Sequence, residues 1–336
     1  MILKEGRAAE MRQAILLIIV TTAVGSLNAQ TTPISAIQAP EMVTPRDTSE
    51  ILKNVEVLKN VPYCTGGGLP LLMDLYLPRH PFAKLAPAIL WLHGGGWRIG
   101  SKEEGPLTVD FASHGLIVAS ANYRLSSESP FPAAIEDAKC AVRYLRANAT
   151  KYGIDPNRMG VAGSSAGGHL ALLVATAHES AGFEGSGGWN GVNSRVSAVL
   201  SWFGPSDFSV GPEAFEKGSG FSIRLFLGGN PNQKSDNYKN ASPVNWASND
   251  DPPLLLIHGD KDDVVPFDQS VRMAKAYRKF GLDVRLVRVK NAGHNFQKAG
   301  RAPISPSSGK IKAISVAFFE RTLGAAAGKA ADHNLH

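Results

Sequence analysis

The sequence predicts an α/β fold in which a mostly parallel sheet is flanked by helices on both faces. Strand-like and helix-like runs alternate from residue 88 to residue 322, as expected for parallel strands joined by helical crossovers. Two glycine-rich motifs, residues 93–97 and 163–167, each follow directly after an apolar, strand-like run. Loops at the carboxyl ends of parallel strands are where such folds bind their ligands.

Length and composition agree with one globular domain, expected over residues 49–325. The chain has 336 residues, of which 43% are apolar and 19% are charged, ordinary values for a globular α/β domain. The net charge of +6 is spread along the chain, and no nucleic-acid-binding motif accompanies the basic residues. We therefore expect no nucleic-acid partner, and the oligomeric state is left open.

The N-terminus has the features of an export signal. Residues 14–24 form an apolar run that suits a signal-peptide core and is too short for an ordinary membrane span. A cut after Ala29 would make residues 1–29 a signal peptide. Translation could also begin at Met11. The alternative interpretation of this segment is an uncleaved membrane anchor. We expect a secreted or periplasmic protein without stable membrane association, with a flexible leader at residues 30–48 and a tail at residues 326–336.

Cys64 and Cys140 are the two cysteines of the chain, one near an early strand and one within a helix-like run. Export would permit a disulfide, but spacing does not show whether the two side chains meet. A bridge and two separate structural thiols both remain open. The sequence has no zinc-ligand spacing and no glycine-rich nucleotide motif, so we expect neither a metal nor a cofactor.

The regular elements follow one another along the chain. The expected strands are residues 88–92, 116–121, 158–162, 196–202, 254–257 and 284–289, and the expected helices are residues 133–147, 169–177, 266–280 and 310–322. Residues 204–246 are the least regular segment. Its aromatic side chains could stack on a substrate, but a small core of the insertion itself is the favoured interpretation; they are Phe208, Phe215, Phe221, Phe226, Tyr238 and Trp246.

Ser165 is the candidate nucleophile. It is the central residue of Gly163-Ser164-Ser165-Ala166-Gly167, a G-x-S-x-G between a strand-like and a helix-like run. A serine on so tight a turn needs small neighbours, because the strand and the helix on either side nearly collide. A glycine-rich turn without function is the alternative, so the catalytic interpretation requires a base, an acid and oxyanion donors elsewhere.

Candidate oxyanion donors come from His93-Gly94-Gly95-Gly96-Trp97, which follows the apolar run 88–92. Consecutive glycines let backbone N–H groups approach a small anionic oxygen closely. A histidine after a buried strand and a tryptophan at the other end argue against a merely flexible turn. Trp97 is the candidate wall of a substrate pocket.

His294 is the candidate base among the nine histidines, because it follows a late strand in a turn-rich loop, residues 291–296. His258 is the main competitor. It ends the apolar run 254–257, and we interpret it as a structural histidine with satisfied hydrogen bonds.

The candidate acid lies within residues 258–266, which offer three aspartates: Asp260, Asp262 and Asp263. Any of them gives the chain order serine, acid, histidine, which is that of one large hydrolase group and not that of chymotrypsin or subtilisin. Order alone does not choose among the three.

The sequence resembles the α/β-hydrolase superfamily over most of residues 50–325, and within it the esterases related to hormone-sensitive lipase and to bifunctional acetylxylan and feruloyl esterases. The resemblance rests on HGGGW at 93–97, ANYRLS at 121–126, FPAAIEDAKCAVRYLR at 131–146, GIDPNRMGVAGSSAGGHLAL at 153–172, LLLIHGDKDDVVP at 254–266 and AGHNF at 292–296.

This resemblance implies that Asp262, four residues after the histidine of the H-G motif, is the acid, and that Asp260 and Asp263 are loop residues. It also implies an oxyanion hole formed by Gly95, Gly96 and Ala166. Residues 30–60 do not have the pattern of the helical cap found in hormone-sensitive-lipase relatives, which favours an open site with little or no cap. The expected activity is hydrolysis of short-chain acyl esters through an acyl-serine, with acetyl or feruloyl groups on plant polysaccharides as possible substrates.

Three alternatives to this activity remain. A peptidase of the prolyl-oligopeptidase type usually has a large propeller domain, for which this chain has no room. An arylformamidase-like amidase could use the same triad. A non-catalytic binding protein of the hydrolase fold typically lacks a member of the triad, and none is missing here.

Overall fold

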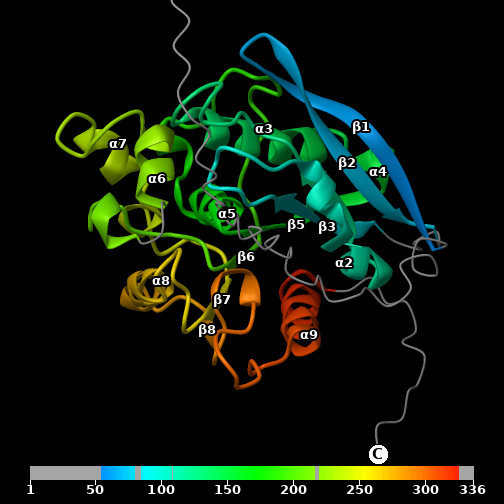
Figure 1. Cartoon of the computed structure of the whole chain (residues 1–336). Coiled ribbons are helices and arrows are strands. Elements are labelled where there is room, and N and C mark those ends of the chain that lie inside the picture. The colour runs from blue at the N-terminus through cyan, green and yellow to red at the C-terminus, as the bar shows by residue number, and fades with distance from the viewer. Residues whose placement is uncertain (1–53, 80–84, 108, 216–218, 325–336) are drawn as a thin grey trace, which may run out of the picture. The chain divides into compact units, whose positions relative to one another are not determined.

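An eight-stranded sheet forms the centre of the fold in the computed structural model (Figure 1), which describes residues 54–79, 85–107, 109–215 and 219–324. The strand order is β1-β2-β4-β3-β5-β6-β7-β8, and only the pairs β1–β2 and β2–β4 are antiparallel. The strands are β1 (Val55–Gly66), β2 (Leu69–Pro78), β3 (Ala86–Leu92), β4 (Ile117–Ala121), β5 (Ile154–Ser164), β6 (Ala198–Trp202), β7 (Leu254–Gly259) and β8 (Val284–Val289). The mostly parallel sheet predicted from the sequence is confirmed.

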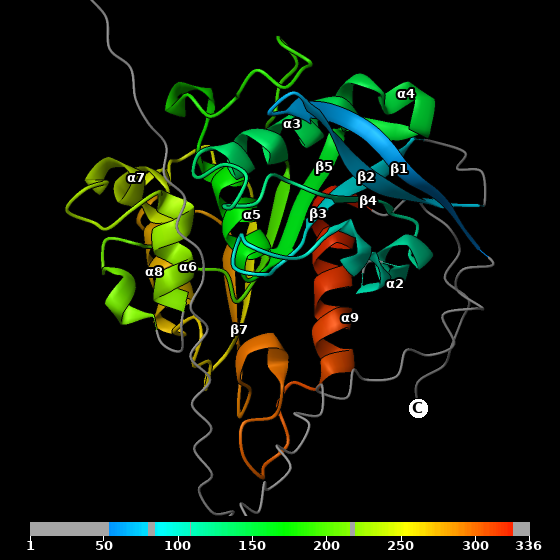
Figure 2. The same ribbon diagram turned by 45° about the horizontal axis from the view of Figure 1, so that its top comes forward.

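Helices cover both faces of this sheet (Figure 1, Figure 2). The α-helices are α2 (Val109–Ser113), α3 (Ala133–Ala147), α4 (Ala149–Tyr152), α5 (Ala166–Thr176), α6 (Ser219–Leu227), α7 (Ser235–Asn240), α8 (Asp268–Lys279) and α9 (Ser308–Phe319). Helices α3, α5 and α8 share one hydrophobic core, while α2 and α9 share a second core on the opposite face. Within β3, Leu90 belongs to the first core and Trp91 to the second, because successive side chains of a strand point to opposite faces.

Most predicted elements lie where the sequence pattern puts them, and α3 and β8 have the predicted bounds. The hairpin β1–β2 was not predicted. Many β1 side chains are at least partly exposed, and its pairing with β2 has register shifts at Leu58/Val61 and Pro62/Cys64, so no regular alternation marks it in the sequence. The predicted signal peptide, leader and tail (residues 1–29, 30–48 and 326–336) lie outside the described residues.

A largely buried ion pair joins two of the sequence motifs. Arg124, in the motif at 121–126, donates from Nη2 to Asp137 of α3 at 2.7 Å, and the Arg124 backbone N–H donates to the same carboxylate at 2.8 Å. Asp137 is 2% exposed. Charge-assisted, bidentate contacts of this kind hold their partners in one geometry, so the segment after β4 is fixed against α3.

Aromatic side chains of residues 204–246 are mostly buried, as predicted, but they do not form a core of their own. Phe208, Phe215, Phe226 and Tyr238 all belong to the core that contains α3 and α5. Phe221 differs, with 54% of its surface exposed. The short helices α6 and α7 are therefore packed extensions of the main domain.

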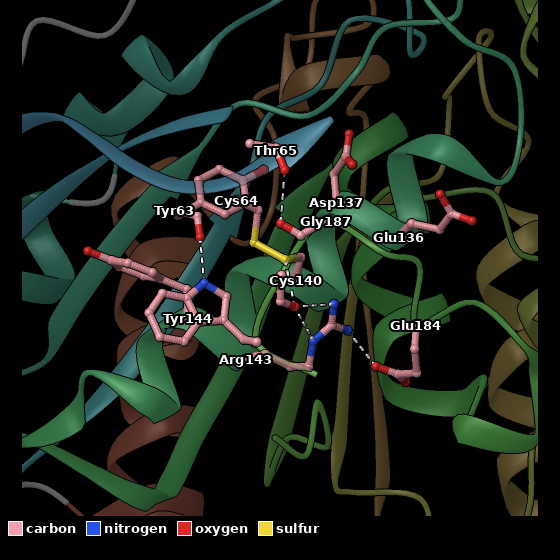
Figure 3. Close-up of a disulfide and its surroundings, with 12 residues drawn as sticks. Tyr63, Cys64, Thr65, Glu136, Asp137, Cys140, Arg143, Tyr144, Glu184 and Gly187 are labelled. Atoms are coloured by element: carbon pink, nitrogen blue, oxygen red, sulfur yellow. Dashed lines mark hydrogen bonds and ion pairs between the residues drawn. A yellow bond between two sulfur atoms is a disulfide. The ribbon is translucent and has the colours of Figure 1, made fainter. Parts of the chain in front are cut away.

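Cys64 of β1 and Cys140 of α3 form a disulfide, which decides the alternative left open by the sequence (Figure 3). The loop at residues 184–189 lies against the bridge: the Thr65 N–H donates to Gly187 O at 3.0 Å, and Arg143 Nη1 contacts Glu184 Oε2 at 2.6 Å. The disulfide thus attaches the edge hairpin to α3, and these polar contacts attach the loop at residues 184–189 to both.

Removal of this disulfide should lower the stability of the domain. The bridge closes a loop between residues 76 positions apart, and such crosslinks typically stabilise a fold by about 2–4 kcal/mol, mainly by restricting the unfolded chain. We expect the double variant Cys64→Ser/Cys140→Ser to melt roughly 5–15 °C below the native protein in a calorimetric scan. An unchanged melting temperature in the variant would contradict the claim that the Cys64–Cys140 bridge stabilises the domain.

Candidate active site

Ser165 lies at the sharp turn between β5 and α5. Its backbone has φ 53° and ψ −119°, a conformation that is strained for a residue with a side chain. A Cβ on Gly163 would collide with the backbone of Gly167, and a Cβ on Gly167 would collide with the carbonyl oxygen of Leu92 in β3. The expectation that this turn needs small neighbours is confirmed.

The side chains of Ser165, His294 and Asp262 form a continuous chain of hydrogen bonds. His294 Nε2 lies 3.0 Å from Ser165 Oγ, and His294 Nδ1 lies 2.8 Å from Asp262 Oδ2. Ser165 follows β5, Asp262 follows β7, and His294 follows β8. The three residues therefore lie together at the carboxyl ends of three parallel strands. The structure brings together the three residues that the sequence singled out.

Asp262 is the best-connected group of the site. Its side chain is fully buried, and Oδ1 accepts hydrogen bonds from the N–H groups of Val264 and Val265, each at 2.9 Å. Burial alone would raise the pKa of this carboxyl, but hydrogen bonds from His258 and His294 hold its pKa well below the usual range. A carboxylate that stays ionised can orient the imidazole and stabilise its cation.

Asp260 and His258 have other partners. Asp260 accepts from the Asn291 N–H at 2.8 Å and pairs with Arg288 at 3.0 Å, which makes it a residue that holds the loop. His258 is buried and its ring nitrogens contact Ser270 and Val265, as expected for a structural histidine. Unexpectedly, His258 also contacts Asp262 Oδ2, at 3.2 Å.

The glycine loop after β3 faces Ser165. Gly94, Gly95 and Gly96 line the same cleft as Ser165, and a Cβ on Gly94 would lie 3.6 Å from Ser165 Cβ. Positive φ angles of 97° at Gly95 and 60° at Gly96 are accessible to glycine without strain. Ala166, the third predicted donor, is the first residue of α5, where backbone N–H groups are free of helical partners.

Buried polar groups hold this loop in place. The His93 ring stacks on Tyr123 with 4.2 Å between ring centroids, and Tyr123 OH donates to His93 O at 2.9 Å. Burial lowers the pKa of His93 to about 4, so the ring is neutral at pH 7. Glu104 accepts from the Gly94 N–H at 3.3 Å, and burial raises the pKa of its carboxyl.

Trp97 is among the residues that line the cleft, although its ring is largely buried. The ring stacks on Phe226 of α6 at 4.5 Å, and Nε1 donates to His169 Nδ1 of α5 at 3.2 Å. Trp97 therefore connects the glycine loop with both α5 and the 204–246 segment.

The cleft has a volume of about 580 Å³, within the usual range for small-molecule sites. Further side chains line it: Arg98, Ile99, Glu104, Pro205, Phe215, Ser219, Ser222, Ile223, Val264, Val265 and Asn295. Phe215 is one of the aromatic residues considered above for stacking on a substrate, Arg98 follows Trp97 directly, and Val264, Val265 and Asn295 lie within the quoted motifs. The sequence did not indicate the others, and the contributions of α6 depend on how residues 204–246 fold back. A hydroxyl, an imidazole and a carboxylate aligned in such a cleft can perform nucleophilic acyl transfer.

Comparisons with known proteins agree with the fold. The family model described as BD-FAE matches residues 73–277. The esterase LipQ of Mycobacterium tuberculosis is 28% identical over 275 residues, which are 81% of this chain and 65% of LipQ. The esterase LipC of the same organism is 29% identical over 245 residues, which are 71% of this chain and 60% of LipC. The chain thus spans somewhat less than two thirds of these curated relatives.

Solved structures match the chain over nearly their whole length, and two examples follow. A truncated carbohydrate esterase from gut microbiota is 30% identical with a TM-score of 0.70, covering 80% of this chain and 96% of that one. Esterase 2 of Thermogutta terrifontis, solved with propionate bound, is 26% identical with a TM-score of 0.66, covering 82% and 97% of the two chains.

The variant Gly167→Ala tests the tight packing of the turn. Because the added Cβ would meet backbone atoms of β3, we expect a loss of roughly 3 kcal/mol in the free energy of unfolding, measured by urea denaturation. Gly309→Ala is the matched control, since a Cβ there meets nothing within 4 Å. Equal stability of the two variants would show that the turn has room to relax.

Proposed function

The chain belongs to the BD-FAE family and has the α/β-hydrolase fold, and on this premise we propose that it is a serine carboxylic ester hydrolase. The hydrogen-bonded chain of Ser165, His294 and Asp262 in an open cleft is the observation that supports the proposal most directly. Esterases among its curated and structural relatives support the same activity.

The proposed reaction proceeds in two acyl transfers. His294 Nε2 takes the proton of Ser165 Oγ as that oxygen attacks the ester carbonyl, and Asp262 stabilises the resulting imidazolium. The N–H groups of Gly95, Gly96 and Ala166 bind the oxyanion. His294 then protonates the leaving alcohol, and a water molecule, activated by the same imidazole, hydrolyses the acyl-serine.

The proposed substrates are esters of short acyl groups, including acetyl or feruloyl groups on plant polysaccharides. The lining of the cleft supports this choice: Phe215, Ile223 and Val264 offer apolar surface, while Arg98 and Glu104 offer charged groups that can bond to hydroxyls. The solved neighbours named as a carbohydrate esterase and as an esterase with bound propionate are consistent with it.

The proposed location is outside the cytoplasm, in the periplasm or the medium. The predicted signal peptide lies outside the described residues, so the support comes from the disulfide, which forms in oxidising compartments. None of the helices in the described ranges combines the length and apolar character that a membrane crossing needs.

The test is a set of initial rates on acetyl, butyryl and octanoyl nitrophenyl esters, acetylated xylan, methyl ferulate and an amide matched to one ester. We expect ester hydrolysis to exceed amide hydrolysis and to fall with acyl length. Release of acetate from xylan or of ferulate would support a polysaccharide esterase, and activity confined to nitrophenyl esters would restrict the proposal to a general carboxylesterase.

Ser165→Ala should remove this activity while leaving the melting temperature within a few degrees of the native value. Ser197→Ala is the matched control, because Ser197 precedes β6 at the opposite end of the sheet and bonds to Asn157 O. Native-like rates in Ser165→Ala, or a preference for the amide, would overturn the proposal.

A further inference from the structure

His258 is a completely buried histidine in β7, four residues before Asp262. Its Nε2 lies 2.9 Å from Val265 O and 3.2 Å from Asp262 Oδ2, and its Nδ1 lies 2.7 Å from Ser270 Oγ in α8. Both neighbours of Nε2 are acceptors, so we assign the proton to Nε2. Nδ1 is then free to accept from the Ser270 hydroxyl, and a neutral ring satisfies all three contacts.

Asp262 thereby has donors on both of its oxygens. Oδ1 accepts from the N–H groups of Val264 and Val265, and Oδ2 accepts from His294 Nδ1 and His258 Nε2. Since the Asp262 side chain has no exposed surface, each missing donor would leave a buried charged oxygen less well solvated. His258 is the donor that approaches Oδ2 from the strand rather than from the loop.

We propose that His258 is a positioning residue for the reaction: by donating to Oδ2 it fixes the carboxylate of Asp262 in the orientation that aligns His294 with Ser165. The inference rests on the roles proposed above for these three residues. His258 does not line the cleft, so it acts through Asp262 and not on the substrate.

The contact of His258 with Val265 connects the hydrogen bonds around Asp262 with the wall of the cleft. Val264 and Val265 line the cleft, and the Val265 carbonyl shares the Nε2–H of His258 with Asp262. On the other side of the ring, Ser270 belongs to the first turn of α8. From its place in β7, His258 therefore contacts both α8 and the loop that contains Asp262. These contacts lie next to the carboxylate whose orientation matters for His294.

The charged residue beside His258 on the neighbouring strand is engaged elsewhere. Arg288 of β8 is the strand partner of His258, and its guanidinium pairs with Asp260 at 3.0 Å. The rings that surround His258 are apolar: Phe203 at 6.5 Å and Phe267 at 5.7 Å between centroids. Asp262 is thus the charged group that the ring of His258 meets directly.

The test compares two amide variants that differ by one methylene. His258→Gln places a side-chain N–H near the position of Nε2, whereas the shorter side chain of His258→Asn cannot reach Asp262. We expect His258→Asn to lower kcat on nitrophenyl acetate about ten- to hundredfold with little change in KM, the size expected for one hydrogen bond to a buried charge. His258→Gln should stay within a few-fold of the native kcat.

A double-mutant cycle with Asp262→Asn then shows whether the effect passes through the acid. If it does, His258→Asn should cost little or nothing further in the Asp262→Asn background. A full additional loss there, or equal losses in the two amide variants, would overturn the inference and leave His258 with a purely structural role. Melting temperatures of all variants control for unfolding.

The same measurements separate this inference from the proposed function. If the native protein shows no activity that Ser165→Ala abolishes, the proposed function itself fails. If that activity is present but His258→Asn and His258→Gln behave alike, only the positioning role of His258 fails.

Discussion

The close approach of the turn around Ser165 to strand β3 is the constraint on which the rest of the site depends. Gly163 and Gly167 leave no space for a Cβ, because the backbones of β5, α5 and β3 nearly touch there. This packing holds Ser165 in a strained backbone conformation at the start of α5 and brings the glycine loop after β3 to within contact distance of it. Ser165 and the proposed oxyanion donors are therefore held by the main chain itself.

Asp262 is the second residue of the site whose position is tightly fixed. Its carboxylate accepts from four donors, which lie in β7, in the loop after β7 and in the loop after β8. Two donors are backbone N–H groups, whose positions follow from the chain path, and two are histidine rings. Because the carboxylate is buried and ionised, it can hold His294 at 2.8 Å without competition from water. The site is thus assembled from strand ends whose order the sheet determines.

Much of this arrangement could be predicted from the sequence, because the residues concerned lie in short motifs with a physical meaning. Ser165 and Gly95 stand in turns that only small residues permit, and β8 is a run of apolar and basic residues just before the loop of His294. The choice of Asp262 required a resemblance to known proteins, since three aspartates follow β7 within four residues. Contacts that depend on how segments pack or on the path of a turn were beyond such reasoning. The Cys64–Cys140 bridge depends on how an irregular edge hairpin packs on α3, and the contact of His258 with Asp262 depends on the turn that brings the loop back to β7.

Covalent labelling of the proposed nucleophile, Ser165, tests the central claim most directly. The protein would be treated with one equivalent of the organophosphate paraoxon, digested and analysed by mass spectrometry. The account predicts one diethylphosphoryl group per chain, located on Ser165 in the peptide that joins β5 to α5. An unlabelled protein, or a label on another residue with Ser165 unmodified, would contradict it.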